Sequence, residues 1–515
     1  RSRTRPGPSG AKKGTRWSPP VLGHRNFLKP RLYPKIRTRH VRLAVTGYSR
    51  AGKTVFLTSL INHLKYHDPE AFKLAARSIR LVKVDDHQPK RTVWDTFPYD
   101  EHRACIANRR MWPLKTAASS QYTLSFCRDD SFFTRHHLTI YDLPGERFAD
   151  SAMTYMDFAQ WSQHQLSFLG VALPQDGSTT AATESGDGLA PVARYLQIAR
   201  HGTSGGDQES DLLSGYKRAL AALRRQFHLY ISPSTFMLDE QGQHLFDTAR
   251  AIKDREPSIA DPDLIEKIIH SRYSGLRECE FCPLGEIWWR QKPDLVQRLQ
   301  KRYNEYRQQV TTPLFTTLTS CDGLVILVDV ANILARGPRH LNDAHFFMDQ
   351  ILKALKPGGQ ILQSLLATVG LRRRIRRIAV AASQCDRFHP DDWPKLKELV
   401  RWLSERLVQN IDGIEADYFA CSAVRSTAEV ADGKLRGFVQ SDGNGPAEPK
   451  EYCVSRIPEE WADLRGWPSS WNPDDFRSFP QVLPQMPAVF HAVPDHVGLA
   501  RMFGFVTGWF PNAAD

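Results

Sequence analysis

The sequence predicts an α/β fold whose mostly parallel sheet is interrupted by a large α-helical insert. A strand–loop–helix unit with a glycine-rich loop occupies residues 41–65, and strands alternate with helices again between residues 323 and 421. About 180 residues separate Asp142 from the apolar strand at 323–330, which is far more than one crossover helix requires. We therefore expect one sheet with an inserted domain.

The glycine-rich loop follows an apolar strand at 43–45 and matches the phosphate-loop pattern G-x-x-x-x-G-K-[ST] over residues 47–54. Its glycines let consecutive N–H groups point inward, and the positive end of the following helix faces the same point. We expect Lys53 to neutralise the β- and γ-phosphates of a nucleotide and the Thr54 hydroxyl to bind Mg²⁺. The predicted nucleotide-binding residues here are Tyr48, Ser49, Arg50, Ala51, Gly52, Lys53, Thr54 and Val55.

The net charge of +13 belongs to one end of the chain of 515 residues. Residues 1–40 hold twelve Lys or Arg and no acidic residue, whereas the rest holds 57 basic and 56 acidic residues. We expect residues 1–38 to be a disordered tail that either contacts an anionic surface or is simply solvated. The near-neutral remainder predicts no specific nucleic-acid partner.

The cysteines and the hydropathy favour a cytoplasmic protein. The eight cysteines are scattered, no run of 18 apolar residues occurs, and nothing at the N-terminus resembles a secretory signal. The C-x-x-C at 279–282 has no second ligand pair, so semi-buried thiols are favoured over a zinc site or a redox pair. The one cofactor that we expect is Mg²⁺.

The remaining patterns set the domain boundaries. Strands at 121–127 and 136–141 predict a hairpin, helical spacing recurs at 153–168, 212–227, 262–270 and 295–318, and a Ser/Thr/Gly-rich loop covers 174–188. Helices at 344–366 and 393–408 alternate with strands at 378–382 and 418–421, before a last helix at 497–508. We predict a tail (1–38), a nucleotide-binding domain in two parts (39–149 and 316–515) and a helical insert (150–315).

Three further loops follow strands of the predicted sheet. Asp142-Leu143-Pro144-Gly145 places a carboxylate where P-loop enzymes hold Mg²⁺, and the Gly145 backbone N–H can approach a γ-phosphate. Ser383-Gln384-Cys385-Asp386 and Ser422-Ala423-Val424 end the next two strands. Ligands bind at the carboxyl ends of strands in open α/β sheets, so we expect these loops to form one site.

The Asp386 loop favours guanine over adenine. A carboxylate there would accept from the ring N1–H and the exocyclic amine of guanine, whereas adenine presents an acceptor at N1. The order of the loops resembles that of small GTPases, whose third loop has the sequence N/T-K-x-D. Ser383 and Gln384 differ from the Asn/Thr and Lys of that pattern, so an ATPase stays an alternative. Gln384 can still stack its stem along a base. Ser422, Ala423 and Val424 resemble the loop whose backbone supports guanine O6.

Several stretches together resemble the YcjX-like family of P-loop GTPases, which is associated with bacterial stress responses. They are RLAVTGYSRAGKTVFLTSLIN, FPYDEH, MWPLKT, LTIYDLPGER, FCPL, TTPLFTTLTSCDGLVILVDVANILARGP and CSAVRST, spanning residues 39 to about 430. The resemblance implies a Ras-like nucleotide domain with a helical insert, a switch that binds GTP and GDP, and a protein partner bound through the insert. It also suggests a partner in the inner membrane, with the chain cytoplasmic or peripheral to that membrane.

The same resemblance implies a switch and catalytic groups. The segment at 112–116 is similar to a switch I element, so Thr116 would join Thr54 and Asp142 at Mg²⁺. Arg110, or its neighbour Arg109, would serve as a built-in arginine finger, with a surface arginine as the alternative. Glu146 stands where small GTPases carry a water-orienting Gln. It could orient water or act as a weak base, but its charge would repel the γ-phosphate. An ion pair with Arg147 or Arg110 is the structural alternative. We therefore expect slow hydrolysis, or a nucleotide-bound scaffold with negligible hydrolysis.

Overall fold

A computed structural model describes residues 37–47, 51–74, 79–86, 88, 94–113, 119–171, 189–202, 208–227, 280–355, 375–409, 411–430, 433–440, 447–457, 467–468, 470–476, 482–489 and 491–509. The predicted tail up to residue 36, the loop at 174–188 and the helix at 262–270 lie outside these residues. So do four residues of the predicted site: Tyr48, Ser49, Arg50 and Thr116.

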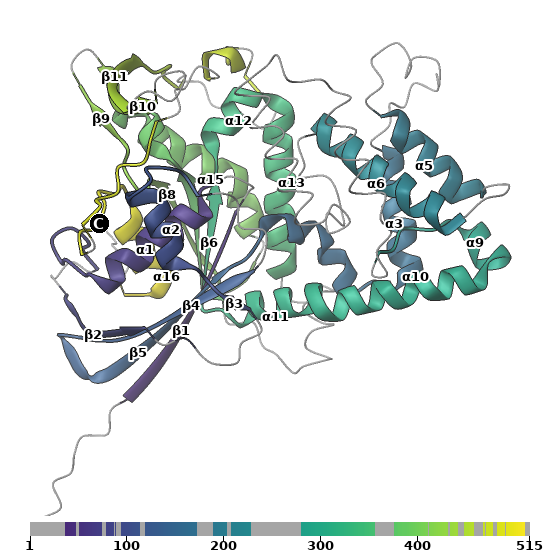
Figure 1. Ribbon diagram of the computed structural model, residues 1–515, viewed down its shortest axis with the longest axis horizontal. Coiled ribbons are helices and arrows are strands. Elements are labelled where there is room, and N and C mark those ends of the chain that lie inside the picture. The colour runs from purple at the N-terminus through teal and green to yellow at the C-terminus, as the bar shows by residue number, and fades with distance from the viewer. Residues whose placement is uncertain are drawn as a thin grey trace, which may run out of the picture.

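An eight-stranded sheet forms the centre of the molecule (Figure 1). Its order is β2 (Leu81–Asp86), β4 (Ser120–Arg128), β5 (Ser131–Asp142), β1 (Arg37–Gly47), β6 (Gly323–Val328), β7 (Arg377–Ser383) and β8 (Glu415–Cys421), with β3 (Asp95–Thr96) beside β4. The strands from β5 to β8 are parallel, whereas β4 pairs antiparallel with β5 and with β2. The predicted α/β class with a mostly parallel sheet is confirmed.

Helices cover the sheet and bury its apolar strands. α1 (Lys53–Lys65), α2 (Tyr99–Ala107) and α16 (Leu499–Thr507) lie on one side of β6 in Figure 1, and α13 (Pro338–Leu355) lies on the other. α15 (Trp393–Gln409) packs against β7, β8 and α13. Every residue of β6 is buried, as expected for a central parallel strand. This core fixes the strand ends that carry the site.

Between β5 and β6 the described elements are helical, and most of them share a second core, whereas α11 packs into the core under the sheet. They are η1, a 3₁₀ segment (Gly145–Thr154), α3 (Phe158–Val171), α5 (Ala190–His201), α6 (Gln208–Phe227), α9 (Glu286–Gln291), α10 (Pro293–Tyr306), η4, a π-helical turn (Arg307–Thr311), and α11 (Thr312–Ser320). Trp161, Tyr195, Tyr216 and Trp288 lie in this second hydrophobic cluster. The helical content agrees with the predicted insert, and its boundaries at 150 and 315 stay a prediction.

Several element ends differ from the predicted ones. β1 begins at Arg37, inside the predicted tail, because it pairs with β5 from Arg37↔Thr134 onward. Met153 lies in η1, so the helix expected from 153 begins only at Phe158. The strand expected at 323–330 ends at Val328, since the Asp329 carboxylate accepts from the Asn332 amide at 3.0 Å and caps α12 (Val330–Arg336). α13 then begins at Pro338 instead of 344.

A small antiparallel sheet near the C-terminus was not predicted. It contains β9 (Thr427–Glu429), β10 (Lys434–Gln440) and β11 (Ala447–Cys453), and β10 lies in the middle. β11 is mostly exposed and carries Lys, Glu and Pro, so no apolar alternation marks it. Short 3₁₀ turns η5 (Cys385–Arg387), η6 (Pro390–Asp392) and η8 (Pro473–Phe476) complete this part. The small sheet lies beside the loop that follows β7, because the Thr427 hydroxyl donates to the Asp386 carbonyl.

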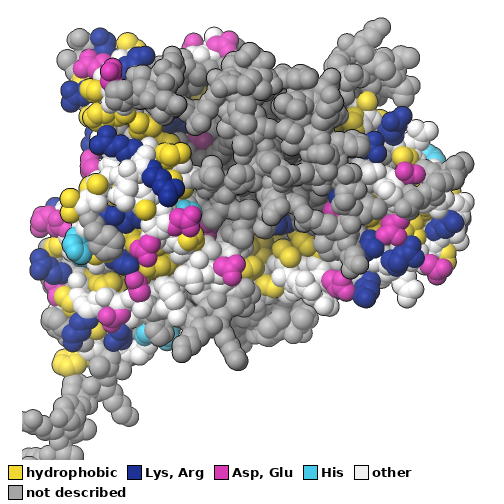
Figure 2. All heavy atoms as spheres, viewed as in Figure 1, with side chains coloured by type: hydrophobic (Ala, Val, Ile, Leu, Met, Phe, Trp, Pro, Cys, Tyr) yellow, Lys and Arg dark blue, Asp and Glu magenta, His cyan; other side chains and the backbone are white. Residues whose placement is uncertain are grey.

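The visible surface mixes charges of both signs. Figure 2 shows Lys and Arg interspersed with Asp and Glu over the coloured parts of this face. This distribution agrees with a near-neutral body. No helix among the described residues combines the length and the apolar character that a membrane crossing requires.

Candidate nucleotide-binding site

The strand register brings the predicted loops to one edge of the sheet. Val45 of β1 pairs with Asp142 at the end of β5, and Gly47 pairs with Leu327 near the end of β6. Ser383 at the end of β7 pairs with Cys421 at the end of β8. Because all five strands are parallel, the loops after β1, β5, β7 and β8 leave the sheet on the same side.

The phosphate loop is shaped by two glycines. A Cβ at Gly47 would lie 2.4 Å from the Leu327 carbonyl oxygen, so only glycine lets β1 approach β6 this closely. Gly52 has a left-handed backbone (φ 79°) and directly precedes α1. The Lys53 ammonium donates to the Gly47 carbonyl at 3.0 Å, which holds the side chain back over the loop. The positive end of α1 and Lys53 thus share one small region, as an anion site requires.

The residues predicted to hold Mg²⁺ fit that ion chemically. Asp142 is buried at the end of β5, next to the strand that leads into the phosphate loop, and the Leu143 amide donates to the Val45 carbonyl at 2.9 Å. Thr54 is buried in the first turn of α1. Mg²⁺ usually takes one or two carboxylates, a hydroxyl, waters and substrate phosphates rather than an all-protein cage.

Gln384 lies against the phosphate loop. Its backbone is left-handed (φ 56°), and the position of a Cβ on Gly52 would be 3.9 Å from its Nε2. The Arg387 guanidinium donates to the Gln384 side-chain oxygen at 3.3 Å. The third loop therefore sits directly beside the first, and the Gln384 stem borders the space between them.

Asp386 is held by groups that the sequence pattern did not indicate. Its side chain is 6% exposed, and its Oδ2 accepts from the Ser426 amide at 2.8 Å. Burial raises the pKa of Asp386 above its usual value, while the hydrogen bond from the Ser426 amide opposes that rise. Burial, aided by the charge of Asp386, also raises the pKa of Tyr452 on β11 to about 12. The small sheet therefore borders the predicted base-reading carboxylate.

The loop after β8 is tied to the phosphate-loop helix. The Ser59 hydroxyl of α1 donates to the Ala423 carbonyl at 2.5 Å. The Ser422 hydroxyl donates to the Val424 carbonyl at 3.1 Å and fixes the turn. Val424 and Val55, both predicted site residues, belong to one small hydrophobic cluster. The first and fourth loops therefore form a single unit.

Two predicted catalytic residues, Arg110 and Glu146, have positions that leave their roles untested. Arg110 has a left-handed backbone (φ 50°), and its guanidinium lies 5.6 Å from the ring centre of Phe438 on β10. Glu146 lies in η1, directly after Gly145. Nothing in these positions tests an arginine finger or a water-orienting carboxylate, and both roles stay predictions.

Sequence reasoning missed the residues that connect the loops. Ser426 and Ser59 lie in two of the stretches that resemble the family, but nothing in those stretches indicates their contacts, since their partners are 40 and 364 residues away in the chain. The Trp393 indole donates to the Cys385 carbonyl at 2.9 Å and braces the Asp386 loop. Only the fold reveals such contacts.

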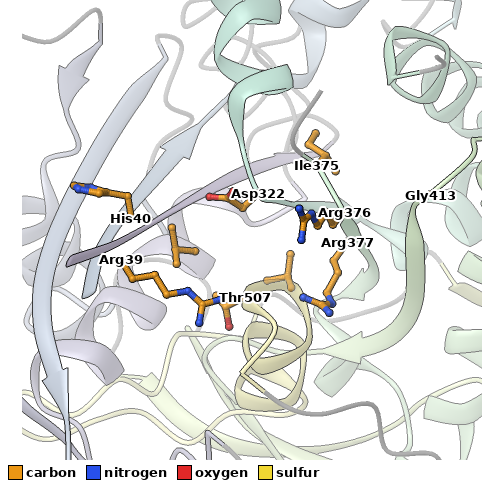
Figure 3. A pocket seen from close by; sticks show the side chains of 10 residues that line it. Arg39, His40, Asp322, Ile375, Arg376, Arg377, Gly413 and Thr507 are labelled. Atoms are coloured by element: carbon orange, nitrogen blue, oxygen red, sulfur yellow. The ribbon is translucent and has the colours of Figure 1, made fainter. Parts of the chain in front are cut away.

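A cavity of about 510 Å³ lies at the opposite edge of the sheet (Figure 3). It is lined by residues at the amino ends of β1 and β7, including Arg39 and Arg377. Arg377 is paired with Glu415 at 3.0 Å, and the Asp322 carboxylate accepts from the Arg42 amide at 2.9 Å. Arg377 and Asp322 therefore have structural partners, and the cavity is separate from the four loops.

Comparisons with known proteins show the family of this chain. The model of the YcjX-like family, DUF463, matches residues 41–245 and 268–508. The chain is 25% identical to the Ras-like GTPase YcjX of Escherichia coli (strain K12) over 503 residues, covering 91% of this chain and 96% of that protein. It is 24% identical to the Ras-like GTPase YcjX of Shewanella oneidensis over 416 residues, covering 76% and 78%. The family match spans most of the sequence, and the chain belongs to the YcjX-like family.

Proposed function

We propose that this protein is a Mg²⁺-dependent GTP-binding switch that hydrolyses GTP slowly. The observation that carries the proposal is the meeting of the loops after β1, β7 and β8 at one sheet edge. Gln384 borders Gly52, and Ser59 of the phosphate-loop helix bonds to Ala423. The relatives named Ras-like GTPase support the same reading.

Each loop has a distinct task in the proposed site. Lys53 and the backbone N–H groups at the start of α1 neutralise phosphate charge, and Gly145 offers its backbone N–H to the γ-phosphate. Thr54, Thr116 and Asp142 are the proposed Mg²⁺ ligands. The chemistry that Mg²⁺ supplies in such sites is neutralisation of charge between the β- and γ-phosphates. We expect slow hydrolysis, because a glutamate at position 146, where small GTPases carry a glutamine, would repel the γ-phosphate.

Asp386 selects guanine in this proposal. A carboxylate at the base accepts two N–H groups from guanine but meets a lone pair on adenine N1. The Ser426 amide holds Asp386 Oδ2 at 2.8 Å, which fixes the carboxylate in one orientation. A fixed acceptor discriminates between bases better than a mobile one, because the wrong base leaves it unpaired while it is buried.

The helical region supplies the output of the switch. Residues 150–315 are proposed as an insert that binds a protein partner, in a stress response as the family resemblance implies. The basic residues of the tail are proposed to contact an anionic surface.

Replacing Lys53 tests the phosphate site. Lys53→Ala removes the charge that faces the phosphates, and a charge-assisted hydrogen bond contributes about 1.5–3 kcal/mol. Titration with GDP should therefore show affinity at least about tenfold weaker. Lys65→Ala is the matched control, because Lys65 lies on the same helix but pairs with Asp86 at 2.6 Å. Unchanged GDP affinity in Lys53→Ala would contradict the proposal.

Phosphate release separates a slow enzyme from a scaffold. The proposal predicts measurable single-turnover release from bound GTP, and a faster rate in Glu146→Gln, because the neutral amide removes repulsion of the γ-phosphate. If neither protein releases phosphate while GTP stays bound, the scaffold reading replaces hydrolysis.

A further inference from the structure

The segment that follows the D-x-x-G loop is bonded to the long helix of the helical region. The Arg147 guanidinium donates to the Tyr306 hydroxyl at 3.0 Å, and that hydroxyl donates to Asp150 Oδ2 at 2.9 Å. Arg147 and Asp150 both lie in η1, while Tyr306 is the last residue of α10. One phenol oxygen therefore joins two residues of η1 to a helix 159 residues away in the chain.

The direction of these bonds is fixed by charge. The guanidinium has only donors and the carboxylate is an acceptor, so the phenol must accept from one and donate to the other. Burial raises the pKa of Tyr306 well above its usual value, so the hydroxyl keeps its proton at neutral pH. Asp150 is 1% exposed, which makes its hydrogen bonds expensive to lose.

Tyr306 also lies at an irregular point of the helix. The π-helical turn η4 begins at the next residue, and the Thr311 hydroxyl donates to the Arg307 carbonyl at 3.0 Å within it. π-helical turns interrupt regular helices and are frequent at functional sites. Beyond the turn, Phe315 of α11 meets Phe148 of η1 edge to face, with ring centres 5.5 Å apart. η1 therefore contacts the long helix on both sides of the irregular turn.

α11 leads directly into the central sheet. It ends at Ser320, and β6 begins at Gly323 beside β1, the strand of the phosphate loop. On its other side, α10 contributes Leu299 and Tyr303 to the second core. A movement of η1 that follows the nucleotide would thus act on a helix that spans both cores.

We propose that Tyr306 is a positioning residue, which through Arg147 and Asp150 couples η1, and with it the γ-phosphate end of the site, to the helical region. The inference rests on the proposed function, because it requires a nucleotide beside Gly145. Tyr306 does not touch the nucleotide; it makes the placement of η1 and the placement of α10 depend on each other.

Hydrogen exchange in the full chain, loaded with GDP or with GTPγS, tests the coupling. In the wild type, the two nucleotides should give different amide protection both in η1 and around η4. Tyr306→Phe keeps the ring and removes the hydroxyl, so the difference around η4 should disappear while that in η1 persists. The ratio of GDP to GTPγS affinity should shift by at least about fivefold, the lower end of usual allosteric coupling.

Tyr195→Phe is the matched control. Tyr195 is fully buried in the second core, and its hydroxyl donates to the Pro283 carbonyl at 2.7 Å, which does not belong to η1. It should lower stability yet leave both the nucleotide-dependent protection and the affinity ratio unchanged. Arg147→Gln removes the hydrogen bond to Tyr306 from the η1 side and should cause the same loss of nucleotide-dependent protection around η4. This second variant keeps the test decisive if Tyr306→Phe folds poorly.

The outcomes distinguish the coupling from the proposed function. If the chain binds nucleotide but η4 shows no nucleotide-dependent protection, or keeps it in both variants, the coupling is overturned and the switch site stands. If Tyr195→Phe shifts the affinity ratio as much as Tyr306→Phe, the effect is one of stability, and the positioning role is overturned. A chain that binds no guanine nucleotide overturns the proposed function and the coupling with it.

Discussion

Gly47→Ala is expected to destabilise the nucleotide-binding part of the chain, because its one added atom, the Cβ, has no room. The added Cβ would lie 2.4 Å from the Leu327 carbonyl oxygen and 3.0 Å from the Leu327 Cβ. Both belong to β6, which is paired with β1 at this point, so neither atom can rotate away as a flexible side chain would. An ordinary contact would require the two strand ends to separate by roughly 1 Å, in a sheet whose strands lie about 4.8 Å apart.

The loss of stability in Gly47→Ala has two sources, which are overpacking and weakened hydrogen bonds between β1 and β6. Overpacking costs about 1–3 kcal/mol and a lost hydrogen bond about 1 kcal/mol, so we expect a loss of about 2–4 kcal/mol in the free energy of unfolding. At roughly 2–4 °C per kcal/mol for domains of 150–250 residues, the melting temperature should fall by at least about 4 °C. GDP affinity should fall too, since the Gly47 carbonyl positions Lys53.

Gly170→Ala is the matched control for thermal unfolding. Gly170 lies in α3, and its added Cβ would meet only the end of the Arg200 side chain, at 3.2 Å, which can shift by a few tenths of an ångström while it donates to the Leu166 carbonyl. Helices favour Ala over Gly by about 0.5–1 kcal/mol, so this variant should melt at the same or a higher temperature. The reasoning fails if Gly47→Ala melts like the wild type, or if both variants lose the same stability.

Two further predictions concern the metal and acid stability. Asp142→Asn should reduce by about tenfold the gain in GTP affinity that Mg²⁺ provides, as measured by titrations with and without EDTA. Asp130→Asn, at the turn before β5, is the control and should keep that gain. An unchanged gain in Asp142→Asn would exclude Asp142 as a ligand. His63 of α1 is buried against Phe72, and burial, with the nearby His496 and His67, lowers its pKa to about 3. Above the unfolded pKa near 6.5, His63 is neutral in both states and does not reduce stability. As pH falls from there toward 3, the unfolded chain takes up a proton that the folded chain does not, so the free energy of unfolding falls by up to about 1.4 kcal/mol per pH unit. His63→Gln should therefore flatten the pH dependence of urea unfolding between pH 6 and 4, and an equal slope in both proteins would contradict this.

The sequence predicted those parts of the fold that depend on local patterns. The phosphate loop lies between an apolar strand and a helix rich in apolar residues, so its position followed from short-range chemistry. The alternation of strands and helices after 323 then implied parallel pairing, which placed Asp142, Asp386 and Ser422 at one edge. These predictions needed no knowledge of long-range contacts.

The contacts that hold the site together could not be predicted in the same way. Ser426 reaches Asp386 and Arg147 reaches Tyr306 across 40 and 159 residues, and no local pattern marks such pairs. The small sheet escaped because β11 is exposed and lacks apolar alternation. The extra helix α12 escaped because its cap, Asp329, follows a buried strand without a break. In each case tertiary packing decides what a short window leaves open.

Calorimetric titration of GTP, GDP and ATP with Mg²⁺ tests the guanine-binding claim most directly. The wild type should bind guanine nucleotides at least tenfold more tightly than ATP, and Asp386→Ala should remove about 1.4 kcal/mol or more of that preference. Asp391→Ala, in the exposed turn η6 beyond the loop, should keep the preference. Equal binding of ATP and GTP to the wild type, or a preference that survives in Asp386→Ala, would contradict the account.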